Sequence, residues 1–438
     1  MNNGKIIWFI EHISRELDVA AVVKALLQNK FHKKITILPY EFNKRFSKYS
    51  PDIVLLPHCY SINDPELSNF LTLWPTAVYI NLAWEQIFYK ANLEYKAPRD
   101  EFAKKYIIHH SWSKKRKVFL ESKGVPKKNI FTNGQPAYQL YKNPYRKIFA
   151  DRKFLAREFK LDSHKKWLFF PENYSWFFYS EHNLEDIIKH GQSREVVYTM
   201  KNYCRKSLSF VLEWLGKASE KYQDNYEIIL RPRPAFSLEY FQNKMKEHFP
   251  EISPKIRIIK DYSVREWIMA SDLIVSSFST SLIEAAIAHK PIYMLEPFKI
   301  PQVLMSGWYD HVLKIKRLNE FLRLFELKNY QHSYNKLFYW AKKEFFVKPD
   351  PIMGLVDFLG KFNVREYHLE KNNINYLIST LKTSKSGWKS IKNHIINLLG
   401  KIKRSVADDA SYYRNDDQER YLSEIKVRVK KCHELFRQ

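Results

Sequence analysis

The chain has 438 residues, 45% of them hydrophobic and 27% charged, which is enough for two or three domains with cores of their own. Its 10 glycines, 19 prolines and 16% aromatic content exclude a collagen-like, low-complexity or disordered chain. The net charge of +26 favours polyanionic ligands, but no nucleic-acid-binding motif accompanies it, so we expect phosphorylated molecules or anionic lipid rather than nucleic acid.

The first third of the chain alternates short apolar runs with stretches of helical spacing. Apolar residues recur at helical spacing between Leu17 and Leu27. Six runs predict buried strands: Lys5–Ile10, Ile35–Leu38, Ile53–Leu56, Val78–Asn81, Tyr106–His109 and Asn129–Thr132. The sixth leads into Asn133-Gly134-Gln135-Pro136, a sequence typical of a turn. Strand–helix alternation of this kind favours a parallel sheet with helices on both faces.

The pattern restarts after a polar, basic stretch between residues 141 and 166, which we interpret as the connection between two lobes. Five further strands are predicted: Trp167–Phe170, Glu227–Leu230, Ile256–Lys260, Leu273–Ser276 and Pro291–Leu295. The predicted fold is α/β, with two facing doubly wound, Rossmann-like lobes (residues 1–145 and 146–360) and a basic helical tail (residues 361–438). Ligands of such sheets bind at the carboxyl ends of the strands, which predicts a site in the cleft between the lobes.

Residues 382–404 of the tail combine an apolar stripe at helical spacing with seven lysines and arginines and no acidic residue. Such a helix either lies on an anionic membrane surface or packs on protein with its lysines in water. No apolar run reaches the roughly 18 residues of a membrane span, and the first residues do not resemble a secretory signal. The three cysteines suggest neither disulfides nor zinc. We therefore expect a cytoplasmic protein whose tail can bind the inner face of the cytoplasmic membrane.

The strongest local pattern is Ala270–Pro291, in which a strand is followed by a Ser/Thr loop and a helix. Ser279, Thr280 and Ser281 are good N-cap residues, and the start of the helix is a candidate phosphate site. Glu284 follows one turn later and is a candidate partner for a ribose. The alternative is ordinary helix capping with a solvated Glu284.

The segment Ile228–Pro234 (IILRPRP) places two arginines at the end of a strand. Residues two apart in an extended chain point the same way, so Arg231 and Arg233 are expected to share one face. Paired guanidinium groups suit bidentate binding of a phosphate or carboxylate. Surface arginines after an edge strand are the alternative.

A carboxylate, Glu172, follows the apolar strand in FFPENYSWFF, with Trp176 and Phe177 close by in the sequence. In such surroundings a carboxyl group can have a raised pKa and act as acid, base or nucleophile. It can equally cap the next helix.

The first lobe offers Glu11, Arg15 and Asp18, whose spacings of four and three would place acid, base and acid on one helical face. A structural set of ion pairs is the alternative. Glu85 and His109 also follow predicted strands and are expected to point toward the same cleft, with His58 as a weaker candidate. Neighbouring histidines such as His109 and His110 are more often structural than catalytic.

Several motifs are absent from the sequence. It contains no Asp-x-Asp motif, no phosphate-binding or dinucleotide-binding glycine loop, and no zinc motif. We therefore expect no metal and no cofactor, with phosphate bound by arginine, hydroxyl groups and a helix dipole.

In this order, the segments IEHISRELD, NGQP, FFPENYSWFF, IILRPRP and SSFSTSLIEAAIAHKPIYMLEP resemble bacterial surface-carbohydrate biosynthesis proteins with the GT-B glycosyltransferase architecture. The arginine–proline strand end is similar to the His-Pro motif of bacterial sialyltransferases and Kdo transferases, and the serine loop to their Ser-Ser motif. In those enzymes both motifs bind the CMP part of the donor. Arg231 and Arg233 stand here in place of the histidine, and the β-Kdo transferases of capsule and O-antigen assembly are the functional analogue suggested.

The resemblance implies a metal-independent glycosyltransferase of surface polysaccharide or lipopolysaccharide synthesis, with a nucleotide-sugar donor such as CMP-Kdo and a lipid-linked or polysaccharide acceptor. On the donor side it implies Glu172 near the reacting sugar, Glu284 on the ribose, and a phosphate set of Arg231, Arg233, Ser279, Thr280 and Ser281. On the acceptor side it implies Glu11, Arg15, Asp18, Glu85 and His109, with Glu11 and His109 as candidate catalysts beside Glu172. The alternatives are a nucleotide-sugar epimerase or polyol-phosphate transferase on the same scaffold, or a non-catalytic binding protein.

Overall fold

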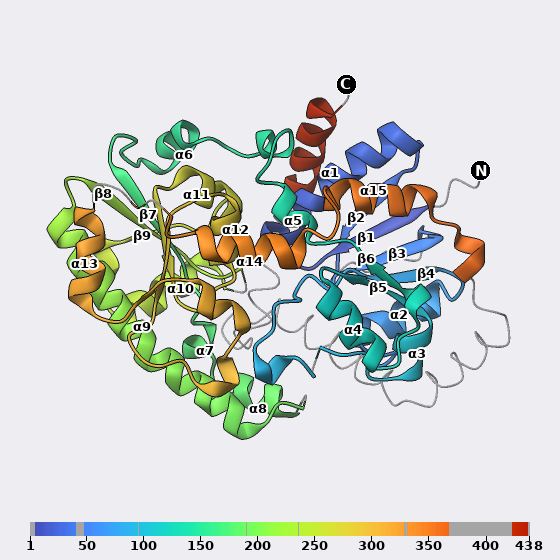
Figure 1. Cartoon of the computed structure of the whole chain (residues 1–438), viewed down its shortest axis with the longest axis horizontal. Helices are drawn as coiled ribbons and strands as arrows, with labels where there is room; N and C mark the ends of the chain where they lie inside the picture. Colours follow the sequence, from blue (N-terminus) through green and yellow to red (C-terminus); the bar gives the residue numbers. More distant parts are fainter. Residues whose placement is uncertain are drawn as a thin grey trace, which may run out of the picture. The chain divides into compact units, whose positions relative to one another are not determined.

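The computed structural model of the chain describes residues 5–367, apart from 41–47, 95, 190, 235, 328, 329 and 331, together with residues 423–436 (Figure 1). The chain forms two compact units. Unit 1 consists of Met1–Gln86, Lys96–Leu140 and Glu344–Gln438, and unit 2 consists of Ile87–Tyr95 and Tyr141–Lys343. Each unit is built around one six-stranded sheet.

The sheet of unit 1 is entirely parallel, with the strand order β2-β1-β3-β4-β5-β6. Its strands are β1 (Ile6–Ile10), β2 (Ile35–Pro39), β3 (Ile53–Leu56), β4 (Val78–Asn81), β5 (Ile107–Ser111) and β6 (Ile130–Thr132). The chain leaves β1 toward β2 on one side and later adds β3 to β6 on the other side. The order therefore reverses between β1 and β3, which is the switch point at which doubly wound sheets bind ligands.

Helices pack on this sheet and against one another. They are α1 (Ile13–Phe31), α2 (Pro65–Leu73), α3 (Glu101–Lys105), α4 (Lys114–Ser122), α5 (Pro136–Gln139) and α15 (Pro351–Lys361), with short 3-10 turns at Lys127–Asn129 and Val364–Tyr367. A further helix spans residues 423–435. Helix α15 packs against α1 and α5, so a helix from late in the chain covers the first helix (Figure 1).

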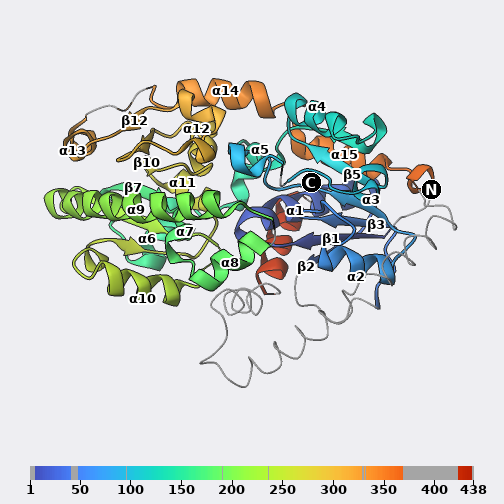
Figure 2. The same cartoon turned by 90° about the horizontal axis from the view of Figure 1, so that it is seen from below.

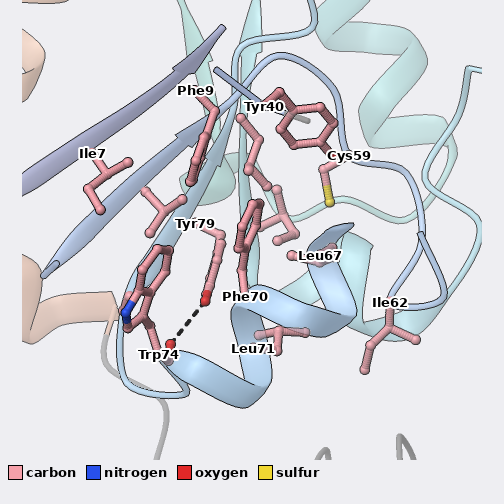
Figure 3. Packing of buried hydrophobic residues seen from close by; sticks show 14 of the residues in the cluster. Ile7, Phe9, Tyr40, Cys59, Ile62, Leu67, Phe70, Leu71, Trp74 and Tyr79 are labelled. Atoms are coloured by element: carbon pink, nitrogen blue, oxygen red, sulfur yellow. Dashed lines mark hydrogen bonds between the residues drawn. The ribbon is translucent and has the colours of Figure 1, made fainter. Parts of the chain in front are cut away.

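An aromatic core lies between α2 and the sheet of unit 1 (Figure 3). Phe9 of β1 stacks on Phe70 of α2 with ring centroids 4.5 Å apart, and Phe70 stacks in turn on Trp74 at 5.6 Å. The hydroxyl of Tyr79 in β4 donates a hydrogen bond of 3.0 Å to the carbonyl of Trp74 (Figure 3). This packing fixes the strands whose carboxyl ends carry the polar residues described below.

The sheet of unit 2 is also entirely parallel, in the order β12-β11-β10-β7-β8-β9. Its strands are β7 (Lys166–Pro171), β8 (Tyr226–Arg231), β9 (Arg257–Ile258), β10 (Leu273–Ser276), β11 (Ile292–Leu295) and β12 (Lys314–Ile315). Here the strand order reverses between β7 and β10, which is the switch point of this sheet.

The helices of this second region are α6 (Arg152–Phe159), α7 (Ser175–Phe178), α8 (Glu181–Lys189), α9 (Arg194–Tyr222), α10 (Leu238–His248), α11 (Val264–Ala270), α12 (Ser281–Ile287), α13 (Leu318–Glu326) and α14 (Asn335–Phe345). The 3-10 turns are Lys90–Asn92, Tyr145–Ile148, Ser253–Lys255, Gln302–Leu304 and Gly307–His311. The long helix α9 runs the length of unit 2 in both views (Figure 1 and Figure 2) and contacts β8 and α13.

The α/β fold with two doubly wound lobes is confirmed, and all eleven predicted strands are present. The two-residue strand β12 was not predicted, because Lys314 and Lys316 interrupt any apolar run there. The predicted second lobe ran to residue 360, whereas the described residues from Glu344 to Tyr367 belong to unit 1. The turn after β6 explains this return: Asn133 Nδ2 donates to Pro351 O at 2.7 Å, and the N–H of Gln135 donates to Phe345 O at 3.0 Å.

No helix among the described residues is long and apolar enough to cross a membrane. The basic stretch 382–404, predicted to bind an anionic membrane surface, lies outside the described residues. The helix at 423–435 lies within the tail at residues 361–438, which the sequence predicts to be helical.

Candidate functional site at the carboxyl edges of the two sheets

Polar residues gather where β7, β8 and β10 end in unit 2. Pro171, the last residue of β7, pairs with Arg231, the last residue of β8. The N–H of Glu172 donates to Arg231 O at 2.9 Å, and the hydroxyl of Ser276 in β10 donates to Pro171 O at 2.6 Å. These contacts bring Glu172 to the switch point of the sheet.

The carboxyl group of Glu172 is buried. It accepts hydrogen bonds from the N–H of Tyr174 and, at 3.4 Å, from the N–H of Arg233. Burial raises the pKa of Glu172 to about 7, although these hydrogen bonds and the charge of Arg233 oppose the rise. A carboxyl group that changes its protonation state near neutral pH can serve as an acid or a base.

The side chains of Arg231 and Arg233 contact different residues. Arg231 is buried, and its guanidinium group donates to the carbonyl of Tyr262 at 2.8 Å. Arg233 is half-buried and donates to the hydroxyl of Ser175 at 3.0 Å, close to Glu172. Their contacts therefore do not support the prediction that both side chains bind one phosphate from a shared face. Of the two guanidinium groups, that of Arg233 lies close to Glu172.

The serine loop follows β10. Helix α12 begins at Ser281, and the side chain of its N-cap residue, Thr280, makes no capping hydrogen bond. The hydroxyl of Ser279 does this work instead, since it accepts from the N–H of Ser281 at 3.3 Å and donates to the Ser281 hydroxyl at 3.2 Å. Ser277 is the first residue after β10. Its hydroxyl is hydrogen-bonded to that of Tyr174, so the serine loop is connected to the segment that carries Glu172.

Glu284 takes part in a structural ion pair. Its Oε2 atom lies 3.2 Å from the guanidinium group of the buried Arg265 and accepts a hydrogen bond of 2.9 Å from the hydroxyl of Tyr141. The predicted contact with a ribose must compete with these two partners. The geometry therefore favours a structural role for Glu284. The sequence-based alternative was a solvated carboxyl group, whereas the carboxyl group is paired with Arg265 and Tyr141.

In unit 1, Arg15 holds three carboxylates together at the carboxyl edge of the sheet. Its guanidinium nitrogens lie 2.7 Å from Glu11, 2.7 Å from Glu85 and 2.8 Å from Glu16. Glu16 is fully buried and also accepts the N–H of Glu11 at 3.0 Å. Glu16 was not among the residues predicted from the sequence, because a charged residue in the first turn of a helix is usually solvated.

The ionisation of Glu11 is set by its neighbours. Burial raises its pKa, but His12, His58 and Arg15 lower it more, so that the pKa of Glu11 lies well below its usual value. The imidazole of His58 lies 3.6 Å from Glu11 Oε2, and that of His12 lies 3.9 Å from Oε1. Glu11 is thus an ionised carboxylate with an imidazole on either side.

Asp18 does not join this set. It is buried, and its Oδ1 atom lies 3.3 Å from the guanidinium group of Arg428 in the C-terminal helix. The predicted row of acid, base and acid on one helical face is therefore wrong for its last member. The reason is that α1 is packed by helices on several sides, so residues three apart on α1 contact different neighbours.

His109 was predicted as a catalyst facing the acceptor, and its position contradicts this. It is buried, its Nε2 atom lies 2.7 Å from Ala103 O, and its Nδ1 atom lies 3.3 Å from Asn81 Nδ2. Burial lowers the pKa of His109 to about 4, so the ring is neutral at pH 7. The structural alternative holds for His109, while His58 reaches the edge of the sheet.

No protein-family model and no curated protein sequence matches the chain. Among solved structures, the wall teichoic acid polymerase TagF superposes with a TM-score of 0.52 at 11% identity, over 84% of this chain and 90% of that chain. The UDP-GlcNAc 2-epimerase from Neisseria meningitidis, bound to UDP-GlcNAc, superposes with a TM-score of 0.50 at 14% identity, over 81% of this chain and 99% of that chain. The fold is GT-B. Identities this low establish the fold alone.

This GT-B chain therefore carries two sets of chemical groups, one at the carboxyl edge of each sheet. Unit 2 offers a carboxyl group that titrates near neutral pH, one guanidinium group and several hydroxyls. Unit 1 offers an ionised carboxylate with two histidines. Within the described ranges, no group of three or more His, Cys, Asp or Glu side chains is arranged to hold a metal ion.

Proposed function

We propose that the protein is a glycosyltransferase that moves a sugar from a nucleotide-sugar donor to a hydroxyl group of a surface-carbohydrate acceptor. The observation that carries the proposal is the position of Glu172 and Arg233 at the switch point of the second sheet, beside the serine loop that follows β10. Ligands of doubly wound sheets bind at that position. A buried carboxyl group beside a half-buried guanidinium group suits a ligand that joins a sugar to a phosphate.

Each of these groups has a role in the proposed transfer. When the bond between the sugar and the phosphate breaks, negative charge develops on the leaving phosphate, and Arg233 and the Ser279 hydroxyl stabilise it. Glu172 lies near the reacting sugar, where its partly protonated carboxyl group donates or accepts a proton. Arg231, whose guanidinium group holds the Tyr262 carbonyl, fixes the loop after β9 rather than binding phosphate.

CMP-Kdo is the donor that the sequence resemblance suggests, and it stays a prediction. The binding of residues 382–404 to an anionic membrane, where a lipid-linked acceptor would lie, also stays a prediction. Epimerisation of a nucleotide sugar is the second candidate, because a carboxyl group with a pKa near 7 also suits proton transfer at a sugar carbon. An epimerase converts its nucleotide sugar without any acceptor, which separates the two activities.

The test is a thermal-shift screen of the whole chain against CMP, UDP, GDP, ADP and CDP. A ligand that binds only the folded protein raises the melting temperature, so the preferred nucleotide identifies itself. We expect Arg233→Ala to weaken binding of that nucleotide about tenfold or more, since a charge-assisted hydrogen bond contributes about 1.5–3 kcal/mol. Arg317→Ala is the matched control, because Arg317 lies in the same unit with 77% of its side chain exposed.

Two results would contradict the proposal. One is a wild-type protein whose melting temperature no nucleotide or nucleotide sugar raises. The other is an Arg233→Ala variant that binds the preferred nucleotide as tightly as Arg317→Ala does.

A further inference from the structure

The switch point of the first sheet holds a preformed pair of a carboxylate and an imidazole. Glu11 is the first residue after β1, and His58 comes two residues after β3, the strand that neighbours β1. The two side chains therefore come from the two strands between which the strand order reverses. Their contact, 3.6 Å between His58 Nδ1 and Glu11 Oε2, joins segments 47 residues apart in the sequence.

Other residues hold this pair in place. Arg15 binds the same Oε2 atom of Glu11 at 2.7 Å and is itself held by Glu16 and Glu85. The ring of Tyr40 meets the His58 ring edge-on at 5.2 Å, and the ring of Tyr60 stacks on it at 6.4 Å. The imidazole thus has a defined position, as a group that must meet a reacting atom requires.

The pair is also accessible. The side chain of His58 is 37% exposed and that of Glu11 is 23% exposed. By contrast His109, the imidazole that the sequence favoured, is buried with both ring nitrogens against protein atoms. Among the described residues, the charged and titratable groups around His58 include Glu11 and His12 after β1, Arg15 and Glu16 of α1, Tyr40 after β2, Tyr60 after β3, and Glu85 and Lys96 beyond β4.

We propose that His58 is the general base that accepts the proton of the acceptor hydroxyl, and that Glu11 is its positioning residue. This inference rests on the proposed function and extends it to the acceptor side. The arrangement is that of a base oriented by a carboxylate. The ionised carboxylate fixes the position of the ring and stabilises the imidazolium that forms.

The step balances without any other reactant. The O–H bond of the acceptor breaks and its proton passes to the His58 ring. The oxygen uses the electron pair left by that bond to form the new bond to the anomeric carbon of the sugar. The bond from that carbon to the phosphate oxygen breaks, and its electron pair leaves with the nucleotide. The proton then passes from His58 to solvent.

The experiment measures nucleotide release with water as the acceptor, so the natural acceptor need not be known. The substrates are nucleotide sugars of the nucleotide that stabilises the wild-type chain most. We expect His58→Gln to lower kcat by about 100-fold or more, the usual contribution of general base catalysis, while the Kd for the nucleotide is unchanged. His182→Gln is the matched control: this histidine also lies beside a carboxylate, 3.4 Å from Asp186, but on α8 and with 56% of its side chain exposed.

Three further measurements separate catalysis from a structural role. Added imidazole should restore nucleotide release to His58→Gly and leave His182→Gly unaffected. In the wild type kcat should fall as pH decreases and the base becomes protonated, and this fall should be lost in His58→Gly. Glu11→Gln should lower kcat and change the pH profile without changing the Kd for the nucleotide, and Glu11→Asp should recover part of the loss.

The failure of this inference differs from the failure of the proposed function. A wild-type chain that neither binds nor releases any nucleotide contradicts the proposed function itself. If the wild type releases nucleotide and His58→Gln does so at the same rate, His58 is not the base and the proposed function stands. Failure of imidazole to restore activity to a folded His58→Gly variant also overturns the inference.

Discussion

At Glu172, burial and hydrogen bonding act on the pKa in opposite directions, and burial prevails. The carboxyl group accepts two backbone N–H groups and lies near Arg233, each of which favours the ionised form. Its pKa is nevertheless raised to about 7, because the group is removed from water. In unit 1 the balance is opposite for Glu11, where Arg15 and two histidines outweigh burial.

The raised pKa of Glu172 has a consequence for stability. An unfolded carboxyl group loses its proton near its usual pKa of 4.5, whereas the folded protein keeps this proton up to about pH 7. Between these pH values the folded state binds more protons, so the free energy of unfolding falls as pH rises, by about 3 kcal/mol from this group. Glu172→Gln removes the effect, and its stability relative to wild type should increase between pH 5 and pH 8.

Denaturant unfolding of both proteins at the two pH values measures this change. The free energy of unfolding of Glu172→Gln should rise relative to that of wild type as pH rises. If the two proteins differ in this free energy by the same amount at pH 5 and pH 8, the carboxyl group of Glu172 does not titrate in this range.

The turn between β6 and α5 shows how a single element directs the path of the chain. Gly134 has a φ of +100°, and a Cβ atom added there would lie 2.4 Å from the carbonyl oxygen of Phe345. On either side of it, Asn133 and Gln135 bind the backbone of the returning segment that leads into α15. Glycine is needed here both for the backbone conformation and for the close approach of Phe345.

Substitution of this glycine separates the two requirements. Gly191 also has a positive φ, +102°, but nothing lies within 4 Å of an added Cβ atom. Gly191→Ala should therefore cost about 1 kcal/mol for the backbone conformation alone. Gly134→Ala should cost about 1–3 kcal/mol more, because a buried contact must shift. Equal losses in the free energy of unfolding would show that the contact with Phe345 does not constrain the turn.

At the scale of the whole molecule, unit 1 is discontinuous in sequence. It is formed by residues from the beginning, the first third and the end of the chain, while unit 2 is inserted between them. Helix α15 covers α1, and Arg428 of the last helix lies 3.3 Å from the buried Asp18 of α1. The helix that carries Arg15 and Glu16 is therefore held by α15 and by the helix at residues 423–435.

Truncation tests this dependence. A chain that ends at residue 343 loses α15, so its α1 should lose protection against hydrogen exchange, while β7 and β8 of unit 2 keep theirs. A chain that ends at residue 367 retains α15 and should keep most of the protection of α1. If α1 is equally protected in both truncated chains, the return of the chain is not what stabilises it.

The candidate site was predictable only in part. Glu172 and Arg233 could be found because each follows directly after a strong apolar strand, and the ends of parallel strands meet at one edge of the sheet. Glu11 and Arg15 could be found because a spacing of four residues places them on one helical face. His58 ranked low and Glu16 was missed, because their significance lies in contacts with residues on other elements.

The sequence by itself determined the strands, their alternation with helices and hence the two doubly wound sheets, because apolar runs and turns are local signals read over a few residues. Only the tertiary structure decided which polar side chains meet. It buried His109 against Asn81 and Ala103, turned Asp18 toward Arg428, and brought His58 to Glu11. Burial and pairing depend on which residues from distant parts of the chain pack around a side chain, and a local sequence pattern does not specify those neighbours.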